Sequence, residues 1–122
     1  MSGTTSGVEF SQTGDDTHMR IYRGKTLRFE VVWGGNNPID VSGYAAALQI
    51  RNLRGDLIFE MSTANGRIAA GDADGKFMFS ATHADTQSIA EVGKWELELT
   101  APGGDVYRAL SGTITPVEEI VT

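Results

Sequence analysis

Two neighbouring segments of the chain alternate between apolar and other residues with a period of two. The first spans residues 27–33 and the second residues 44–51. Every second side chain of a strand points to the same face, so this spacing is typical of strands that bury one face. Residues 34–38, Gly-Gly-Asn-Asn-Pro, favour a turn between the two segments. The faces predicted to be buried carry Leu27, Phe29, Val31 and Trp33, then Tyr44, Ala46, Leu48 and Ile50.

The same alternation predicts further strands, separated by turn-forming residues. They cover residues 18–23, 56–61, 67–70, 76–81, 94–100 and 106–115. Within residues 56–61, Leu57 is expected to point inward and Ile58 outward. Thr82-His83-Ala84-Asp85 resembles a capping box and predicts one short helix that ends at Gly93. The helix is too short to be stable alone, so we expect it to lie across the end of a sheet.

This arrangement of elements predicts an all-β fold. About seven strands with turn signals roughly every 8–12 residues are typical of an antiparallel sandwich. We therefore expect an immunoglobulin-like antiparallel β-sandwich with one short crossover helix. A small barrel is the alternative, because alternation does not determine whether a sheet closes on itself. A chain of 122 residues is long enough for one such domain and its core.

The first sixteen residues differ in composition from the rest of the chain. Residues 1–16 are rich in Gly, Ser and Thr, and only Val8 and Phe10 offer apolar anchors. Ordering such a segment costs more backbone entropy than its burial recovers. We therefore predict a flexible arm over residues 1–16 and a β-sandwich domain over residues 17–122. A disordered terminus with no role is the alternative.

Charge and composition exclude several classes of partner. The chain has 10 basic and 16 acidic residues, a net charge of −6, and no cysteine. Phosphate binding requires a basic face, so nucleic acid is not expected as a partner. No apolar run is long enough to span a membrane, and the N-terminus does not resemble a signal peptide. We expect no membrane insertion, and we expect the chain to be cytosolic where it is made.

No group of residues predicts catalysis or metal binding. Asp72-Ala73-Asp74-Gly75 resembles part of a calcium loop, but the further ligands that such a loop needs are missing, so a turn is expected. His18 and His83 have no partner at metal-binding spacing. No serine lies in a nucleophile elbow. We therefore expect no enzyme activity, and no catalytic, cofactor-binding or metal-binding residues.

Several short motifs carry a resemblance to a known family. They are RGKT (23–26), VW (32–33), PIDVSGY (38–44), QIR (49–51), GKWELEL (93–99) and LSGTI (110–114). In this order they resemble short structural proteins of tailed bacteriophages, which are similar to the immunoglobulin-like N-terminal domains of baseplate and fibre-bearing proteins. The resemblance implies a virion protein, made in the host bacterial cytoplasm, that docks onto other virion proteins as a homo-oligomer. The chain ends just after the last predicted strand, so we expect no appended fibre, lectin or depolymerase domain.

Five apolar side chains break the alternation or allow close approach on the predicted outer face. They are Val32, Ala45, Ala47, Ile58 and Met78. We expect this face to contact neighbouring virion subunits, together with Val8 and Phe10 of an arm that orders on docking. A small domain that binds a host-surface glycan is the alternative function, based on analogy between folds. Its candidate residues are Tyr107, Asn36 and Asn37.

Overall fold

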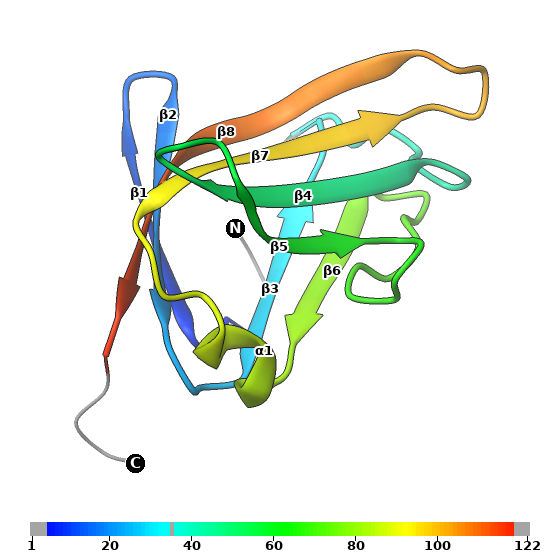
Figure 1. Ribbon diagram of the computed structural model, residues 1–122. Coiled ribbons are helices and arrows are strands. Elements are labelled where there is room, and N and C mark those ends of the chain that lie inside the picture. Colours follow the sequence, from blue (N-terminus) through cyan, green and yellow to red (C-terminus); the bar gives the residue numbers. More distant parts are fainter. Residues whose placement is uncertain (1–4, 35, 119–122) are drawn as a thin grey trace.

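Eight strands and one short helix form the part of the chain that the computed structural model describes, residues 5–34 and 36–118. A six-stranded sheet in the order β1-β2-β8-β7-β4-β5 faces a two-stranded sheet, β3-β6, and α1 lies near one end of the pair (Figure 1). The elements are β1 (Val8–Thr13), β2 (Asp16–Tyr22), β3 (Leu27–Val32), β4 (Ala45–Asn52), β5 (Leu57–Ser62), β6 (Lys76–Ala81), α1 (His83–Gln87), β7 (Gly93–Thr100) and β8 (Val106–Val117).

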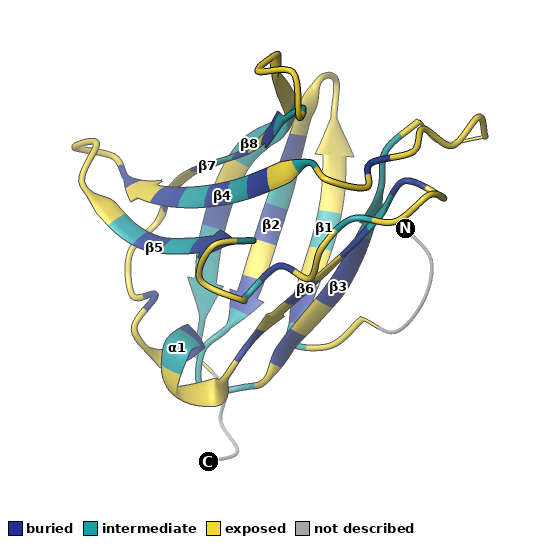
Figure 2. Ribbon diagram, turned by 90° about the vertical axis from the view of Figure 1, so that its right-hand side faces the viewer, coloured by how far each residue is buried: buried dark blue, intermediate teal, exposed yellow. Residues whose placement is uncertain are grey.

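Alternate side chains of both sheets fill the space between them. On β4, Ala46, Leu48 and Ile50 are buried, as their spacing predicts. From the smaller sheet, the rings of Phe29 and Phe79 stack with their centroids 4.5 Å apart. Buried and less buried positions follow each other along the strands (Figure 2). The fold is therefore an all-β sandwich of two sheets, as predicted.

The two sheets meet at two corners through isolated bridges. Ser6, just before β1, pairs with Arg28 of β3, and Ile68, after β5, pairs with Phe79 of β6. Residues 67–70 thus make one bridge and not the short edge strand expected. Beyond the corners the described strands of the two sheets do not pair with each other, so the barrel alternative is not realised there. Among the described strand pairs, β2–β8 is parallel and the others are antiparallel.

The prediction of a flexible arm over residues 1–16 is wrong for the part of it that the structure describes. Val8–Thr13 form β1, which pairs along its length with β2 through the two-residue turn Gly14-Asp15. Val8 is buried and Phe10 packs against the core. The hydrogen bonds of the hairpin and the burial of its apolar side chains offset the entropy cost of ordering this segment, which composition alone made look too large. The sandwich therefore begins well before residue 17, and the first four residues lie outside the described part.

A bulge in β5 reverses the predicted directions of two side chains. Phe59 pairs with Ile50 of β4, but the next pair joins Leu57 to Arg51, so Ile58 is the extra residue. A bulge residue shifts its neighbours to the opposite face of the strand. Leu57, expected in the core, is exposed, and Ile58, expected to point outward, is half-buried against the core.

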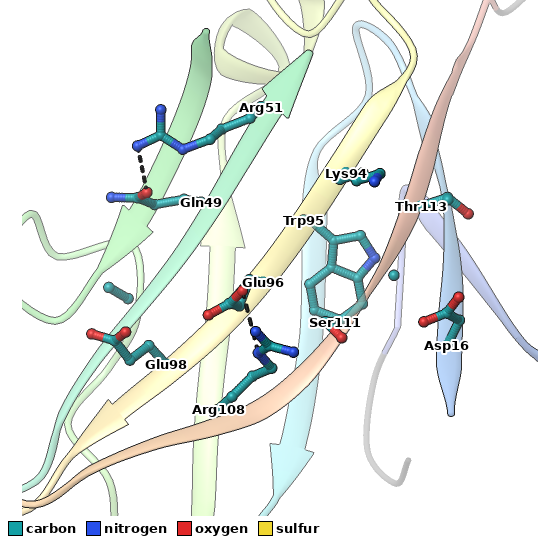
Figure 3. A pocket seen from close by; sticks show the side chains of 12 residues that line it. Asp16, Gln49, Arg51, Lys94, Trp95, Glu96, Glu98, Arg108, Ser111 and Thr113 are labelled. Atoms are coloured by element: carbon teal, nitrogen blue, oxygen red, sulfur yellow. Dashed lines mark hydrogen bonds and ion pairs between the residues drawn. The ribbon is translucent and has the colours of Figure 1, made fainter. Parts of the chain in front are cut away.

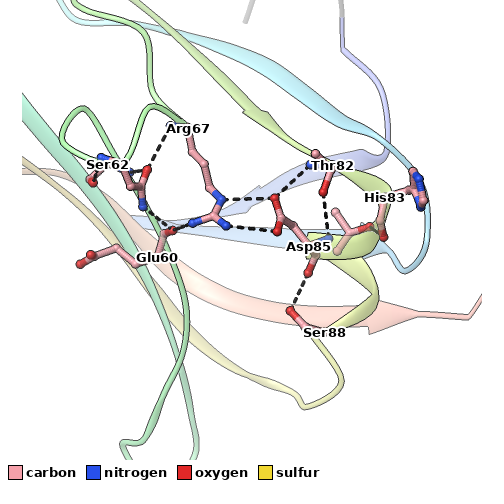
Figure 4. A network of polar contacts seen from close by, with 9 residues as sticks. Glu60, Ser62, Arg67, Thr82, His83, Asp85 and Ser88 are labelled. Atoms are coloured by element: carbon pink, nitrogen blue, oxygen red, sulfur yellow. Dashed lines mark hydrogen bonds and ion pairs between the residues drawn. The ribbon is translucent and has the colours of Figure 1, made fainter.

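The helix begins with the capping box that the sequence predicts. Thr82 Oγ1 accepts the N–H of Asp85 at 3.1 Å, and Asp85 Oδ2 accepts the N–H of Thr82 at 3.2 Å. The helix ends at Gln87, before the expected Gly93, because the chain turns there to enter β7. Arg67 donates two hydrogen bonds to the Asp85 carboxylate, at 3.1 and 3.2 Å, and so ties the loop after β5 to the helix (Figure 4).

Candidate functional site

An apolar groove opens between β1 and β3, where the larger sheet ends beside the smaller one. It has a volume of about 1080 Å³ and reaches the space between the sheets. We call it the β1–β3 groove. Half-buried apolar side chains line it from both sheets, namely Phe10, Val31, Trp33, Ala109 and Leu110. The strands β1 and β3 diverge from the corner at Ser6 and Arg28, and this divergence leaves the groove open.

Phe10 connects the wall of the groove to the core. Its ring meets Phe29 edge-on at 5.1 Å between centroids, and Trp95 at 6.4 Å. Edge-to-face contacts of this kind add to the stabilisation that burial provides. Val8 and Phe10, predicted as docking residues of a mobile arm, are therefore fixed parts of the sandwich. Both line the groove, Val8 as a buried side chain and Phe10 as a half-buried one.

Two aromatic rings from opposite sheets lie together beside the groove. The centroids of Trp33 and Tyr107 are 6.5 Å apart. Alternation predicts that Trp33 is buried. In the structure it is half-buried, because it follows the last residue of β3, at the end of the sandwich. Tyr107 is 42% exposed. The negative charge of Asp105 raises the pKa of Tyr107, so its hydroxyl remains a hydrogen-bond donor at neutral pH.

The outer face of the larger sheet carries a polar hollow of about 510 Å³ (Figure 3). Glu96 of β7 and Arg108 of β8 form an ion pair at 3.4 Å. On β4, Arg51 donates to the side-chain oxygen of Gln49 at 2.9 Å. Positive and negative side chains thus offset each other across the hollow. Its chemistry is that of a solvated sheet face.

The residues predicted to form one assembly face do not lie on one face. Val32 and Met78 belong to the smaller sheet, whereas Ala45 and Ala47 belong to the outer face of the larger sheet. Ile58 is half-buried at the bulge. The outer faces of a sandwich point away from each other. The prediction of a single face is wrong, because alternation identifies the faces of a strand but not the sheet that the strand joins.

In the turn that resembles a calcium loop, the side chain of Asp72 accepts hydrogen bonds from the backbone. Asp72 Oδ1 accepts the N–H groups of Asp74 at 2.9 Å and Lys76 at 3.0 Å. His18 Nδ1 lies 2.6 Å from Oγ1 of Thr113. Within residues 5–34 and 36–118, no group of three or more His, Cys, Asp or Glu side chains is placed to hold a metal ion. The helix in these same residues lacks the length and hydrophobicity needed to cross a membrane.

Taken together, the fold and the groove define a small all-β sandwich domain with an open apolar surface at a strand edge. No protein-family model matches the sequence, and comparison with curated proteins finds no match. Among solved structures, the chain is similar to extracellular domains 3–5 of OTK from Drosophila, with 14% identity and a TM-score of 0.39. The match covers 95% of this chain and 37% of that one, so the chain spans little more than a third of the structure it matches.

Proposed function

We propose that the chain is a non-enzymatic structural component of a tailed-bacteriophage virion. It would act as a tail, baseplate or fibre adaptor, or as a capsid decoration subunit, through protein–protein assembly contacts. The observation that best supports this function is the β1–β3 groove, where half-buried apolar side chains stand beside the edge of a sheet. Exposed apolar surface and open strand edges are the features by which protein domains join other chains.

The most distinctive motif of the family resemblance, residues 38–44, forms a hydrogen-bonded connection before β4. Asp40 Oδ1 accepts the N–H of Ser42 at 2.9 Å, and hydrogen bonding by Ser42 lowers the pKa of Asp40. Gly43 has φ 81°, a conformation that favours glycine. Tyr44 N–H then bonds to the carbonyl of Val41 at 3.1 Å. The motif therefore shapes a loop. This use of the motif supports the proposal that the chain is a structural protein.

The test of this function is to look for the chain in particles. An antibody raised against the purified chain would be used on particles from lysates of the source cell, separated on a density gradient. We expect the chain to sediment with intact particles and to remain after a high-salt wash. An unrelated cytosolic protein of the same cell serves as the control for trapping. A chain found in the soluble fraction, with particles that lack it, would reject the proposal.

Glycan binding is the second candidate, and the pair of rings beside the groove favours it. Trp33 and Tyr107 offer ring faces, and Asn36 lines the same groove. Aromatic rings with nearby amides are a common arrangement for binding sugars. Titration of the chain with a panel of host-surface oligosaccharides, followed by tryptophan fluorescence, tests it. Saturable binding that Tyr107→Ala abolishes would favour this function, and the absence of any saturable change would exclude it for that panel.

A further inference from the structure

The outer edge of β1 presents backbone groups that the described part of the chain does not pair. The carbonyl of Gly7 accepts the N–H of Tyr22 at 3.0 Å, on the β2 side. On the other side, Ser6 exchanges two hydrogen bonds with Arg28, at 2.9 and 3.0 Å. Backbone groups of a strand alternate in direction from one residue to the next. The N–H and C=O groups of Val8, Phe10 and Gln12 therefore point outward, and within the described residues β1 pairs only with β2.

This edge stands directly beside the β1–β3 groove. In Figure 2, β1 lies between β2 and β3, and its far side faces the smaller sheet. Val8, Phe10 and Gln12, which alternation places on one side of β1, line the groove together with Glu9. A strand added to this edge would place every second side chain on that same side, above Val31 and Trp33. The open edge and the apolar groove are therefore two parts of one surface.

The sequence of β1 is complementary to itself. In an antiparallel pair of two copies centred on Phe10, the residues with outward backbone groups face each other, Phe10 with Phe10 and Val8 with Gln12. Each of these pairs exchanges two hydrogen bonds in an antiparallel ladder. The single charged residue of the strand, Glu9, falls opposite Ser11 of the second copy, so no like charges meet. Glu9 is moreover already compensated by Arg20 of its own chain, at 3.7 Å.

The other edge of the larger sheet is less suited to such pairing. At the end of β5, the carbonyl of Ser62 accepts the N–H of Ile68 at 3.1 Å. The N–H of Ser62 donates to the side-chain oxygen of Asn65 at 3.0 Å. Local hydrogen bonds and the bulge thus blunt the β5 edge, in the way that proteins commonly protect an edge strand. We propose that two copies of the chain associate through β1, antiparallel about Phe10, and form one continuous sheet across the dimer.

Such a pair is symmetric, with the same patch on both copies. The Phe10 side chains of the two copies would lie opposite each other, each still packed on the core of its own chain. This dimer would supply a partner for the surface on which the proposed function rests. It can fail in solution while the chain is still found in particles, and it can hold for a chain that is never found there.

Sedimentation velocity over a range of concentrations tests the proposal, with far-ultraviolet circular dichroism to check folding. We expect the parent chain to pass reversibly from monomer to dimer. Ser11→Glu brings a second carboxylate opposite Glu9 at two places in the symmetric pair and should weaken the dimer about tenfold. Ser11→Lys makes the same two contacts attractive and should leave the dimer at least as stable. Ser80→Glu, the same change at an exposed position of β6, is the matched control and should have no effect.

Three results would overturn the proposal. The first is a parent chain that stays monomeric at its highest soluble concentration. The second is a dimer that responds alike to Glu and Lys at position 11, since that would place the contact elsewhere. The third is a monomeric chain whose β1 edge instead takes up an extended peptide of another protein, detected by protection of Phe10 and Gln12 amides from hydrogen exchange.

Discussion

The backbone carbonyl of Thr17, in β2, is contacted by residues of two other strands, β7 and β8. Trp95 of β7 donates its indole N–H to this oxygen at 3.0 Å. Gly112 of β8 lies so close that a methyl group there would overlap the same oxygen. Glycine is required at position 112 by this approach of two backbones; it is the glycine of the segment LSGTI, residues 110–114.

Gly112→Ala is expected to lower the free energy of unfolding by about 3 kcal/mol, because the methyl group forces β8 away from β2. Urea denaturation at neutral pH measures the change. Gly103→Ala is the matched control: no atom lies within 4 Å of the added carbon, so its stability should stay within about 0.5 kcal/mol of the parent. Equal stability of the two variants would contradict the close approach of β2 and β8.

Trp95 and Trp33 should differ in their contribution to stability. Trp95 is 3% exposed and Trp33 is half-buried. Trp95→Ala is expected to lower the free energy of unfolding by about 3–5 kcal/mol, since it leaves a cavity and an unpaired Thr17 carbonyl. Trp33→Ala should cost about 1–2 kcal/mol, because less apolar area returns to water. Thermal and urea denaturation compare them, and a larger loss for Trp33 would reverse the assignment of the core.

The helix α1 depends on the ion pair between Arg67 and Asp85. Both side chains are about a quarter to a third exposed, at 34% and 25%. Hydrogen bonding from Arg67 lowers the pKa of Asp85 in the folded chain. A carboxyl with a lowered folded pKa adds stability that is present above its unfolded pKa and lost as pH falls through the folded value. The tie between α1 and the loop after β5 should therefore weaken in acid.

Asp85→Asn is expected to lower the free energy of unfolding by about 1–2 kcal/mol at neutral pH. It should also remove part of the loss that the parent shows when the pH falls below 3.8, the ordinary aspartate value. Urea denaturation at several pH values measures both effects. Glu96→Gln is the control, because its pair with Arg108 is exposed and should contribute less than about 1 kcal/mol. A parallel acid profile for Asp85→Asn and the parent would contradict the role of this pair.

Alternation along the chain predicts most of the strands. The segments predicted at residues 27–33, 44–51, 76–81 and 94–100 correspond to β3, β4, β6 and β7. The capping box also predicts where α1 begins. These features are local, so neighbouring residues carry the whole signal. The strand β1 has the same local signal, Val-Glu-Phe-Ser followed by the hairpin pair Gly-Asp, but a composition rich in Gly, Ser and Thr outweighed it in the prediction.

The candidate site could not be predicted in the same way. The β1–β3 groove exists because β1 joins the six-stranded sheet while β3 joins the other sheet. The pattern of a strand does not state which sheet it joins, and the predicted assembly face failed for this reason. The bulge at Ile58 is equally hidden, because one residue without a partner leaves the alternation of Leu57–Ser62 outwardly intact. Long-range pairing decides both features.

For the whole molecule, the loss of the N-terminal hairpin strand should strongly destabilise the sandwich. If residues 1–16 were a flexible arm, deletion of residues 2–14 would leave the fold unchanged. In the structure this deletion removes β1, with the buried side chain of Val8 and the core contacts of Phe10. We expect a loss of about 3 kcal/mol or more in the free energy of unfolding, a large share of the stability of a small domain.

The cause of that loss can be separated from the shortening of the chain. A full-length variant with Val8→Ser and Phe10→Ser keeps the hairpin turn but loses both inward side chains of β1, so most of the destabilisation should remain. Ser11→Thr with Thr13→Ser changes two exposed positions of the same strand and should leave stability within about 0.5 kcal/mol of the parent. Urea denaturation of the three variants measures these differences. If deletion of residues 2–14 proves neutral, the larger sheet is complete without β1, and the groove and the edge pairing proposed for it must be rejected together.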